Sequence, residues 1–402
     1  MLKKLVFSVV AVVFFFVIFC IVGEIVFRVI KGAPDNPLAQ ITQNEDNQRF
    51  LFEPGKVMTS RSSAEGEFEY TAHVNSHGYR GKEFSAEKPE GVTRIMAVGD
   101  SFTFGVGAPD DETFAALLEQ GLRKKGFSVE VINAGIGHAS TIRHWDNLQK
   151  IHLRYQPDMV ILFFDMTDVW DDWYWEQHAI WDKQTGKIKR FDLDYSWGTR
   201  NWWPTLVHKS ALCKYLENKI VRTFKKLRLL GLGRYLKAAA SGERAKSVII
   251  HSIGEFSDDV VIEYDALLLM RGRERKDLID EHWTRTARYL KKIHDMLSRQ
   301  GISFVVVMYP HGIYAGPDQW GEGRAAWGFE QGKQYKDYYP FEIMERFARQ
   351  EKIPFINTLT GFLVAAEDMY FFNWDGHMTP KGNHIVVDQI LSDNTFLNLL
   401  QR

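Results

Sequence analysis

One serine of this chain follows a strand-like segment in a tight turn, where a nucleophile could stand. Residues 94–98 (RIMAV) are a short, mostly apolar run that predicts a strand, and Gly99-Asp100-Ser101 comes directly after it. Gly99 lets the chain bend without a Cβ atom, so the turn places Ser101 at the strand tip. An amphipathic helix is expected next, over residues 113–125. The arrangement is typical of a catalytic serine, although an ordinary loop between strand and helix can contain the same short motif by chance.

A second group of residues, near the C-terminus, could activate that serine. Hydroxyl nucleophiles are weak at neutral pH and need a base within hydrogen-bond reach, together with a group that orients the base. His377 and Asp375 can fill these roles if the fold brings their loop over the strand before Ser101. Only Gly376 separates them, so either Asp375 or a backbone carbonyl could orient the ring. Taken alone, His377 could also be a surface residue, because Thr379-Pro380 is typical of a helix N-terminus.

Four short blocks, taken together, resemble the SGNH or GDSL hydrolase superfamily. The blocks occur in the family's order: Gly99-Asp100-Ser101, residues 131–137 (VINAGIG), residues 159–168 (MVILFFDMTD) and residues 375–382 (DGHMTPKG). The first block is not the Gly-x-Ser-x-Gly elbow of α/β-hydrolases, because Thr103 stands at the second glycine. The resemblance covers roughly residues 90 to 390 and implies a serine esterase or acyltransferase with Ser101, His377 and Asp375 as catalytic residues.

The resemblance also implies an oxyanion hole, which this chain would build with altered residues. The backbone N–H of Ser101 would be one donor. The family's next donor, a glycine amide, aligns with His138, so the donor is the amide of His138 or of Gly137. The third donor in the family is an Asn side chain, whereas this chain has Thr167. A threonine hydroxyl can donate a hydrogen bond, but it is shorter and must be oriented by another group.

Short apolar runs alternate with amphipathic segments along the chain, which indicates parallel strands joined by crossover helices. We expect strands at residues 94–98, 128–132, 159–164, 303–309 and 354–357, and helices at 113–125, 141–155, 280–300, 341–350 and 381–390. This order predicts an α/β fold, a flavodoxin-like three-layer α/β/α sandwich with a parallel sheet. Active groups gather at the carboxyl ends of strands in such sheets, where Ser101 and residues 165–168 are expected.

An uncharged apolar run near the N-terminus, residues 5–23, predicts a transmembrane helix. At about 1.5 Å per residue it would extend roughly 28 Å, close to the thickness of a bilayer core. A cleaved signal peptide is the alternative, although the run is longer than a usual signal core and no small-x-small site ends it. Lys3 and Lys4 favour an N-terminus in the cytoplasm, while Arg28 and Lys31 oppose that orientation. We expect a single-pass protein of the cell membrane with its globular domain outside the cytoplasm.

The predicted organisation has five parts. They are a cytoplasmic stub and transmembrane helix (1–32), a tether and small β element (33–90), the first part of an SGNH-like domain (91–168), an aromatic and basic insertion (169–280) and the second part of the domain (281–402). The β element contains Asn75-x-x-Gly78-Tyr79-Arg80-Gly81, which is similar to a stretch in membrane-anchored SGNH proteins. Its expected role is to pack against or shape the rim of the cleft.

The insertion begins with a dense group of aromatic residues. Seven of the chain's twelve tryptophans lie between residues 170 and 203. Their indole faces could stack on sugar rings or cover an acyl chain, and Trp170, Trp173 and Trp175 are the candidates for such binding; the alternative is a small core built from large side chains. Residues 209–237 are basic and partly amphipathic, which is compatible with a membrane-surface helix or with a solvated helix face.

Charge and motif content exclude several other classes of function. The chain has 50 basic and 51 acidic residues, so nothing indicates nucleic-acid binding. His138, His144 and His152 form no recognised metal-binding motif, and Gly105-Val-Gly107 lacks the remaining residues of a dinucleotide loop or a P-loop. No cofactor and no metal are therefore implied, and no protein partner is indicated.

These observations favour a membrane-anchored serine esterase or acyltransferase acting on an O-acyl group. The acyl group is expected to be O-acetyl, on a cell-surface or exported glycan, through an acyl-enzyme on Ser101. A catalytically diminished SGNH domain that binds glycan or organises an assembly is the rival hypothesis, suggested by the altered residues at His138 and Thr167. Retention of Ser101, Asp375 and His377 favours catalysis, because a binding domain has no use for all three.

Overall fold

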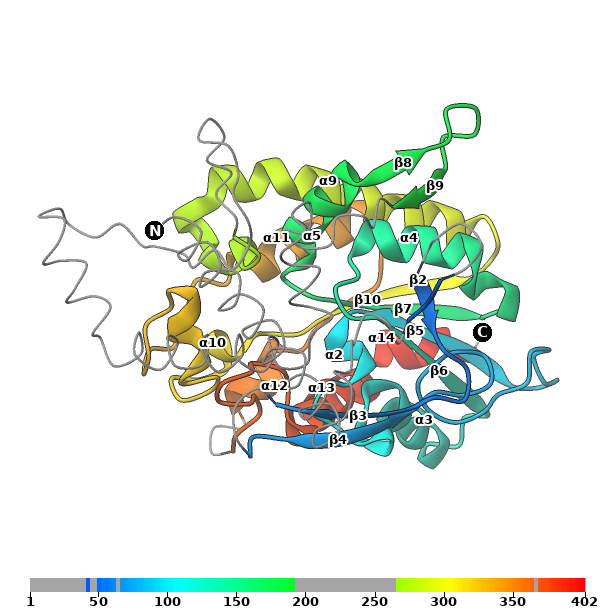
Figure 1. The fold of residues 1–402 in the computed structure, drawn as a ribbon, viewed down its shortest axis with the longest axis horizontal. Helices are drawn as coiled ribbons and strands as arrows, with labels where there is room; N and C mark the ends of the chain where they lie inside the picture. The colour runs from blue at the N-terminus through cyan, green and yellow to red at the C-terminus, as the bar shows by residue number, and fades with distance from the viewer. Residues whose placement is uncertain (1–40, 44–48, 63–65, 192–264, 365–367, 402) are drawn as a thin grey trace, which may run out of the picture. The chain divides into compact units, whose positions relative to one another are not determined.

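The computed structural model describes residues 41–43, 49–62, 66–191, 265–364 and 368–401 (Figure 1). The predicted transmembrane helix at residues 5–23 and the basic segment at 209–237 lie outside these ranges. Within them, no helix is both long and apolar enough to cross a membrane.

A five-stranded parallel sheet forms the centre of the described fold. In spatial order its strands are β11 (Phe355–Asn357), β10 (Ser303–Met308), β7 (Met159–Phe164), β5 (Thr93–Gly99) and β6 (Val129–Gly135). All neighbouring strands are parallel. The residues of β6 and β7 are buried throughout, because helices cover both faces of the sheet, and these strands accordingly lack polar alternation.

Helices lie on both faces of this sheet, as the alternating pattern predicted. In Figure 1, α4 (Thr141–Lys150), α5 (Asp168–Gln177) and α9 (Lys276–Ser298) lie above the sheet and pack against one another. On the other face, α3 (Phe114–Lys124) packs against α13 (Pro380–Ser392). The α/β class with a central parallel sheet is therefore confirmed.

Strand order changes direction beside β5. The chain passes from β5 outward to β6 and then returns to β7 on the other side of β5. Numbered by their order in the chain, the five strands run 2-1-3-4-5, the order found in flavodoxin. In such sheets, ligands bind beyond the carboxyl ends of the strands at this switch point, so the end of β5 is the place where a site is expected.

Several element boundaries differ from the predicted ones. The helix predicted at residues 141–155 stops at Lys150, because Ile151 leaves the helical region (φ −133°), and a short 3₁₀ turn follows at His152–Tyr155. The helix predicted to begin at Asp280 begins at Lys276, directly after another 3₁₀ segment, η4 (Leu268–Arg275). Residues 179–191 contain an antiparallel hairpin of β8 (Ala179–Trp181) and β9 (Ile188–Phe191).

The segment before the sheet forms two small antiparallel pairs. Strand β1 (Ile41–Gln43) pairs with β2 (Arg49–Phe52), and β3 (Val57–Arg61) pairs with β4 (Glu69–His73). We call residues 49–84 the N-terminal β element. Its apolar side chains form a cluster with Phe104, which lies shortly after Ser101 in the chain. The cluster consists of Phe52, Met58, Tyr70, Ala72, Val74 and Phe104.

Remaining helices complete the layers or connect them. The longest of these is α11 (Tyr339–Glu351), which leads into β11 and packs on α9 through Phe347 and Trp283, whose ring centroids are 5.9 Å apart. The others in the described ranges are short: α2 (Ser101–Phe104), η2 (Asp110–Glu112), α10 (Gly312–Ala315), η5 (Gly323–Trp327), α12 (Leu359–Val364) and α14 (Asn394–Leu399).

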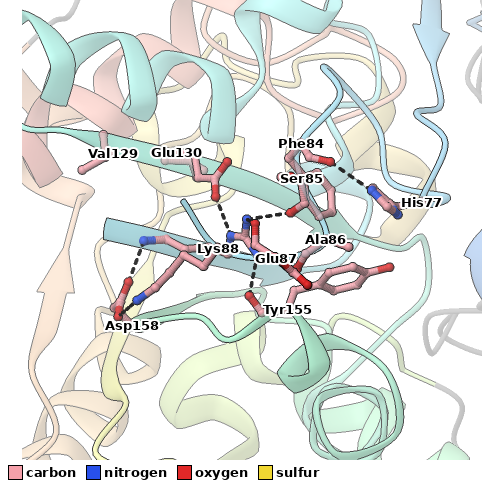
Figure 2. A network of polar contacts seen from close by, with 12 residues as sticks. His77, Phe84, Ser85, Ala86, Glu87, Lys88, Val129, Glu130, Tyr155 and Asp158 are labelled. Carbon is pink, nitrogen blue, oxygen red and sulfur yellow. Dashed lines mark hydrogen bonds and ion pairs between the residues drawn. The ribbon is translucent and has the colours of Figure 1, made fainter. Parts of the chain in front are cut away.

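Arg94 anchors the amino end of β5 through polar contacts with Glu130, Ser85, Tyr155 and Asp158, which are labelled in Figure 2. Its side chain is fully buried, and its guanidinium contacts the Glu130 carboxylate and donates to the carbonyls of Tyr155 at 2.6 Å and Ser85 at 2.7 Å. Its backbone N–H donates to the Asp158 carboxylate at 2.8 Å. This network ties the segment that directly follows the N-terminal β element to the starts of β5 and β7, at the end of β5 opposite Ser101.

Candidate active site

Ser101 lies at the carboxyl end of β5 and is the first residue of α2. A tight turn was expected here, and the turn is in fact the start of a helix, whose Phe102 N–H donates to the Asp100 carboxylate at 2.9 Å. Gly99 is required by close approach: a Cβ there would lie 2.0 Å from Thr103 Oγ1 and 2.9 Å from the Phe163 carbonyl. The glycine thus leaves room for Thr103 of α2 to lie directly against the end of β5, beside the Phe163 carbonyl.

The fold brings His377 and Asp375 to this serine. His377 Nε2 lies 2.8 Å from Ser101 Oγ, and His377 Nδ1 contacts the Asp375 carboxylate. The same carboxylate accepts the His377 backbone N–H at 3.2 Å. Gly376 makes the short spacing workable, because its φ of +91° turns the chain back and a Cβ there would lie 2.7 Å from Trp320 Nε1. Of the two groups that could orient the ring, the structure therefore places the Asp375 carboxylate at Nδ1.

Electrostatics in this trio suit a base and its orienting acid. Burial opposes a charged ring at His377, but the hydrogen bond and negative charge of Asp375, aided by Asp100 and Asp165, outweigh it and raise the pKa of His377. Burial alone would raise the pKa of Asp375, yet its hydrogen bonds to His377 and the charge of that ring leave the pKa below its ordinary value. The carboxylate therefore stays ionised and favours the imidazolium that a proton transfer from Ser101 would form.

A tight turn at residues 136–139 contains the two residues expected to supply an oxyanion donor, Gly137 and His138. Residues Ile136–Ala139 form a turn in which the Ala139 N–H donates to the Ile136 carbonyl at 3.0 Å. His138 adopts φ 59°, the left-handed conformation that glycine usually supplies. Trp175 Nε1 donates to the His138 carbonyl at 2.9 Å and so fixes the turn.

Thr167, the expected third donor, is bound to a carboxylate beneath the site. Its backbone N–H donates to Asp165 Oδ1 at 2.7 Å. Burial would raise the pKa of Asp165, but His311, at 2.9 Å from it, and hydrogen bonds from the Thr167 hydroxyl and N–H lower this pKa to about 2. The Thr167 side chain therefore lies beside the buried carboxyl groups of Asp165 and Asp171.

Two further buried carboxyl groups lie near the carboxyl ends of β5 and β7. Burial, followed by the charge of Asp165, raises the pKa of Asp100 to about 7, and the Tyr309 hydroxyl donates to Asp100 at 3.3 Å. Burial and neighbouring acids also raise the pKa of Asp168 well above its ordinary value. Both Asp168 oxygens are buried and have no hydrogen-bond partner among the residues that the structure describes. Unsatisfied buried acids of this kind are typical of functional sites.

The tryptophans proposed to bind substrate lie in different environments. Trp170 is 2% exposed and packs between α5 and α9, with its ring centroid 4.7 Å from that of Trp173 and 5.3 Å from that of His282. Trp173 is half-buried. Trp175 is half-buried as well, and the Arg143 guanidinium lies 4.4 Å from its ring centroid. Trp175 thus borders the turn at residues 136–139, whereas Trp170 is packed as a core residue.

Sequence patterns missed several residues that support this site. Asp165 was expected at the carboxyl end of β7, but its partner His311, beyond the end of β10, was not identified; the position of both residues at the carboxyl ends of neighbouring strands was the signal that could have paired them. Arg80 was noticed only as part of a motif. Its buried guanidinium donates to the carbonyls of Phe104, Gly105 and Ala108 at 2.9, 2.7 and 2.6 Å, and thereby holds the chain directly after Ser101.

Across the described ranges, no three His, Cys, Asp or Glu side chains are arranged to hold a metal ion. The site itself offers a hydroxyl beside an imidazole and a carboxylate behind the imidazole.

A family model and several solved structures match the chain. The model of the GDSL-like Lipase/Acylhydrolase family matches residues 97–385. An acetyl xylan esterase, AlAXEase, is 14% identical, with 74% of this chain and 98% of that chain covered and a TM-score of 0.36. TesA is 12% identical (77% and 99% covered, TM-score 0.36), and the lipase/acylhydrolase from Enterococcus faecalis is 13% identical (74% and 93% covered, TM-score 0.36). No curated protein sequence matches the chain.

Proposed function

The chain belongs to the GDSL-like lipase/acylhydrolase family of ester hydrolases, and we propose that Ser101, His377 and Asp375 are its catalytic triad. The observation that carries this proposal is the continuous contact from Ser101 Oγ to His377 Nε2, at 2.8 Å, and from His377 Nδ1 to the Asp375 carboxylate. Nucleophile, base and orienting acid stand in the order that acyl transfer through serine requires.

In the proposed reaction, Ser101 Oγ attacks the ester carbonyl carbon while His377 Nε2 takes its proton. The tetrahedral intermediate collapses when the bond to the leaving alkoxide breaks, and His377 gives that alkoxide the proton. Water, activated by His377 in the same way, then attacks the acyl-enzyme and releases the acid. The backbone N–H of Ser101 and that of Gly137 or His138 are the proposed donors to the oxyanion, with the Thr167 hydroxyl as a third.

The proposed substrate is an O-acyl group, specifically O-acetyl, on a cell-surface or exported glycan. The support comes from two indole groups: Trp175 is half-buried and donates to the His138 carbonyl, and Trp374, next to Asp375, is 42% exposed. Flat aromatic faces of this kind are suited to stacking on sugar rings. Transfer to a sugar hydroxyl would share the acyl-enzyme with hydrolysis, and the two reactions differ only in the acceptor.

We propose that the site acts outside the cytoplasm and that residues 5–23 anchor the protein in the membrane. An uncharged run of this length buries apolar surface in a bilayer, an interaction that salt does not weaken. The full-length protein should stay in the membrane fraction through a high-salt wash, and a C-terminal reporter should be active only outside the cytoplasm. A mature protein that begins near residue 33 would identify a cleaved signal peptide in place of the anchor.

A second candidate function is a catalytically diminished domain that binds glycan or organises an assembly. The specific observation that favours it is the residue at position 167, a threonine where the family places the longer asparagine donor. Loss of one such donor lowers turnover by about 100- to 1,000-fold in other serine enzymes.

Labelling with a serine-reactive phosphonate separates the two functions. The full-length protein should be modified once, on the peptide that contains Ser101, and labelling should disappear in Ser101→Ala and nearly disappear in His377→Ala. A folded wild-type protein that the phosphonate does not modify would leave the diminished binding domain as the better account.

A further inference from the structure

The loop that contains the proposed catalytic acid and base is closed by a hydrogen bond between its two ends. On one side it is held by Trp320 and Gly323. We call residues 372–377 the acid loop. Its ends meet through the Phe372 N–H, which donates to the His377 carbonyl at 2.9 Å. Trp320 Nε1 donates to the Trp374 carbonyl at 3.3 Å, and the Gly323 N–H donates to the Asn373 carbonyl at 2.8 Å. These bonds hold the carbonyl groups of the loop.

The amide groups on the other side of the acid loop are held by a residue from the N-terminal β element. Glu67 Oε1 accepts the Trp374 N–H at 2.6 Å, and Glu67 Oε2 accepts the Asp375 N–H at 3.1 Å. The Ser62 hydroxyl donates to the same Oε2 at 2.9 Å. One carboxylate therefore binds two successive amides, and the second belongs to the proposed catalytic acid. Hydrogen bonds to an ionised acceptor are stronger than neutral ones.

A ring contact fixes the neighbouring residue. The ring centroids of Phe68 and Phe372 are 4.6 Å apart. The Phe372 ring also lies close to Gly107, because a Cβ atom on Gly107 would be only 2.3 Å from Phe372 Cε2. The Glu67 carboxylate thus has a supported position against the loop. Its residue number also lies outside residues 97–385, which match the family model.

We propose that Glu67 is a positioning residue of the active site, whose carboxylate holds the backbone of Trp374 and Asp375 so that Asp375 meets His377 Nδ1. The proposal rests on the proposed role of Ser101, His377 and Asp375. It makes the N-terminal β element a part of the catalytic apparatus, because the element reaches the acid directly and not only by packing against α2.

Loss of this carboxylate should act on the orientation of the acid more than on the stability of the fold. Without Glu67, the two amides must turn to water, and a shift of the acid loop moves Asp375 relative to His377. Displacements of about 1 Å at a catalytic group can lower turnover by about 100-fold. The substrate contacts themselves stay in place, so the change should appear in kcat with KM nearly unchanged.

Three variants of the full-length protein distinguish positioning from simple support of a surface turn. Glu67→Ala removes both acceptors, and Glu67→Gln keeps one carbonyl acceptor while removing the charge. Glu69→Ala is the matched control, because Glu69 lies in β4 beside Glu67, is exposed, and pairs with Arg61 at 2.7 Å away from the acid loop.

Two readouts apply to each variant: hydrolysis of an aryl acetate, and titration of His377 followed by NMR of labelled histidine. Glu67→Ala should lower kcat by about 10- to 100-fold, and Glu67→Gln by less. The pKa of His377 should fall in Glu67→Ala by about half a pH unit or more, because the stabilising contact with Asp375 weakens while burial remains. The other charged or titratable groups facing His377 are unchanged in all variants: Asp100, Asp165 and His138.

The sign of the pH effect follows from the base. Hydrolysis needs a neutral His377, so kcat/KM of the wild type should fall as pH drops through a value above 6.5, the ordinary pKa of histidine. In Glu67→Ala the same fall should occur at lower pH. If Glu67 only supports a surface turn, Glu67→Ala should lower the melting temperature and leave the pH at which kcat/KM falls unchanged.

The proposal is overturned if Glu67→Ala has the kcat and the His377 pKa of Glu69→Ala. It is equally overturned if a lower melting temperature accounts for the whole loss of activity and the pKa does not move. A wild-type protein that hydrolyses no ester would refute the proposed function, and the NMR titration would still decide whether Glu67 sets the contact between Asp375 and His377.

Discussion

Buried titratable groups lie at both ends of strand β5, and the two ends differ in how completely these groups are paired and hydrogen-bonded. At the amino end, Arg94 is 0% exposed, and its guanidinium binds the Glu130 carboxylate and several carbonyls. At the carboxyl end, Asp100 has a pKa raised to about 7 by burial and by Asp165, and both oxygens of Asp168 lack a hydrogen-bond partner among the described residues. One strand therefore separates a satisfied network from an unsatisfied one.

This difference indicates what each end does. Burying a charge is costly unless it is paired and hydrogen-bonded, so a complete network such as that of Arg94 serves to hold segments together. Buried acids with raised pKa values persist where the surrounding fold supports them, and they gather at sites of chemistry. The amino end should therefore govern stability and the carboxyl end activity.

The largest effect should come from replacing the triad at the carboxyl end. Ser101→Ala and His377→Ala should each lower kcat/KM for an aryl acetate by about 1,000-fold or more, while the melting temperature stays within a few degrees of wild type. Asp375→Ala should cost less than either, because solvent or a carbonyl can partly replace an orienting carboxylate. Steady-state kinetics and thermal melting of the three variants test this, and equal activity in all of them would remove the serine mechanism.

The opposite outcome is expected at the amino end. Arg94→Met leaves Glu130 and several carbonyls without their donor, so the free energy of unfolding should fall by about 3 to 5 kcal/mol while activity per folded molecule is unchanged. Urea unfolding followed by tryptophan fluorescence measures the loss. Lys88→Met is the control, because its pair with Asp158 is partly exposed and should be worth less than about 1 kcal/mol. A similar loss of unfolding free energy in both variants would mean that the buried Arg94 network contributes no more to stability than a partly exposed ion pair.

Thr167 tests whether an altered residue at the carboxyl end still donates to the oxyanion. If its hydroxyl binds the developing charge, Thr167→Val should lower kcat by about 10-fold with little change in KM, and Thr167→Asn should preserve or raise activity. Kinetics are compared with melting temperatures of the same variants. A Thr167→Val enzyme as fast as wild type would restrict the oxyanion hole to backbone donors and favour the diminished-domain hypothesis.

The smallest effect concerns stability at the carboxyl end and has a defined pH dependence. The folded pKa of Asp100, about 7, exceeds the ordinary value of 3.8, so the folded protein binds more protons between these pH values. Its free energy of unfolding should therefore fall as pH rises through this window. Asp100→Asn keeps an acceptor for the Phe102 N–H and should be more stable than wild type at pH 8 by about 1 kcal/mol or more.

Urea unfolding at pH 4 and pH 8 measures this difference. Glu69→Gln, an exposed carboxylate on β4, serves as the control and should show no comparable gain at pH 8. An Asp100→Asn protein whose advantage is the same at both pH values would show that Asp100 is ionised throughout.

Sequence predicted those features that local patterns encode. The strands of the sheet could be expected, because buried strands leave continuous apolar runs, and the resemblance of four blocks to a known family implied the grouping of Ser101 with Asp375 and His377. Contacts between distant segments that belong to no such block were not predictable: Glu67 meets an amide more than 300 positions away, and His311 pairs with Asp165. Trp170 shows the same limit, since composition cannot tell whether an indole packs in the core or faces a ligand.

The central claim is that Ser101 forms a covalent acyl-enzyme, and rapid quenching of the reaction tests it most directly. The full-length protein is mixed with an aryl acetate, stopped in acid during turnover, digested and analysed by mass spectrometry. The account predicts one acetyl group on the peptide that contains Ser101, increased by raising the substrate concentration and absent in Ser101→Ala. Ester hydrolysis that continues in Ser101→Ala, or an acetyl group found on a different residue, would contradict it.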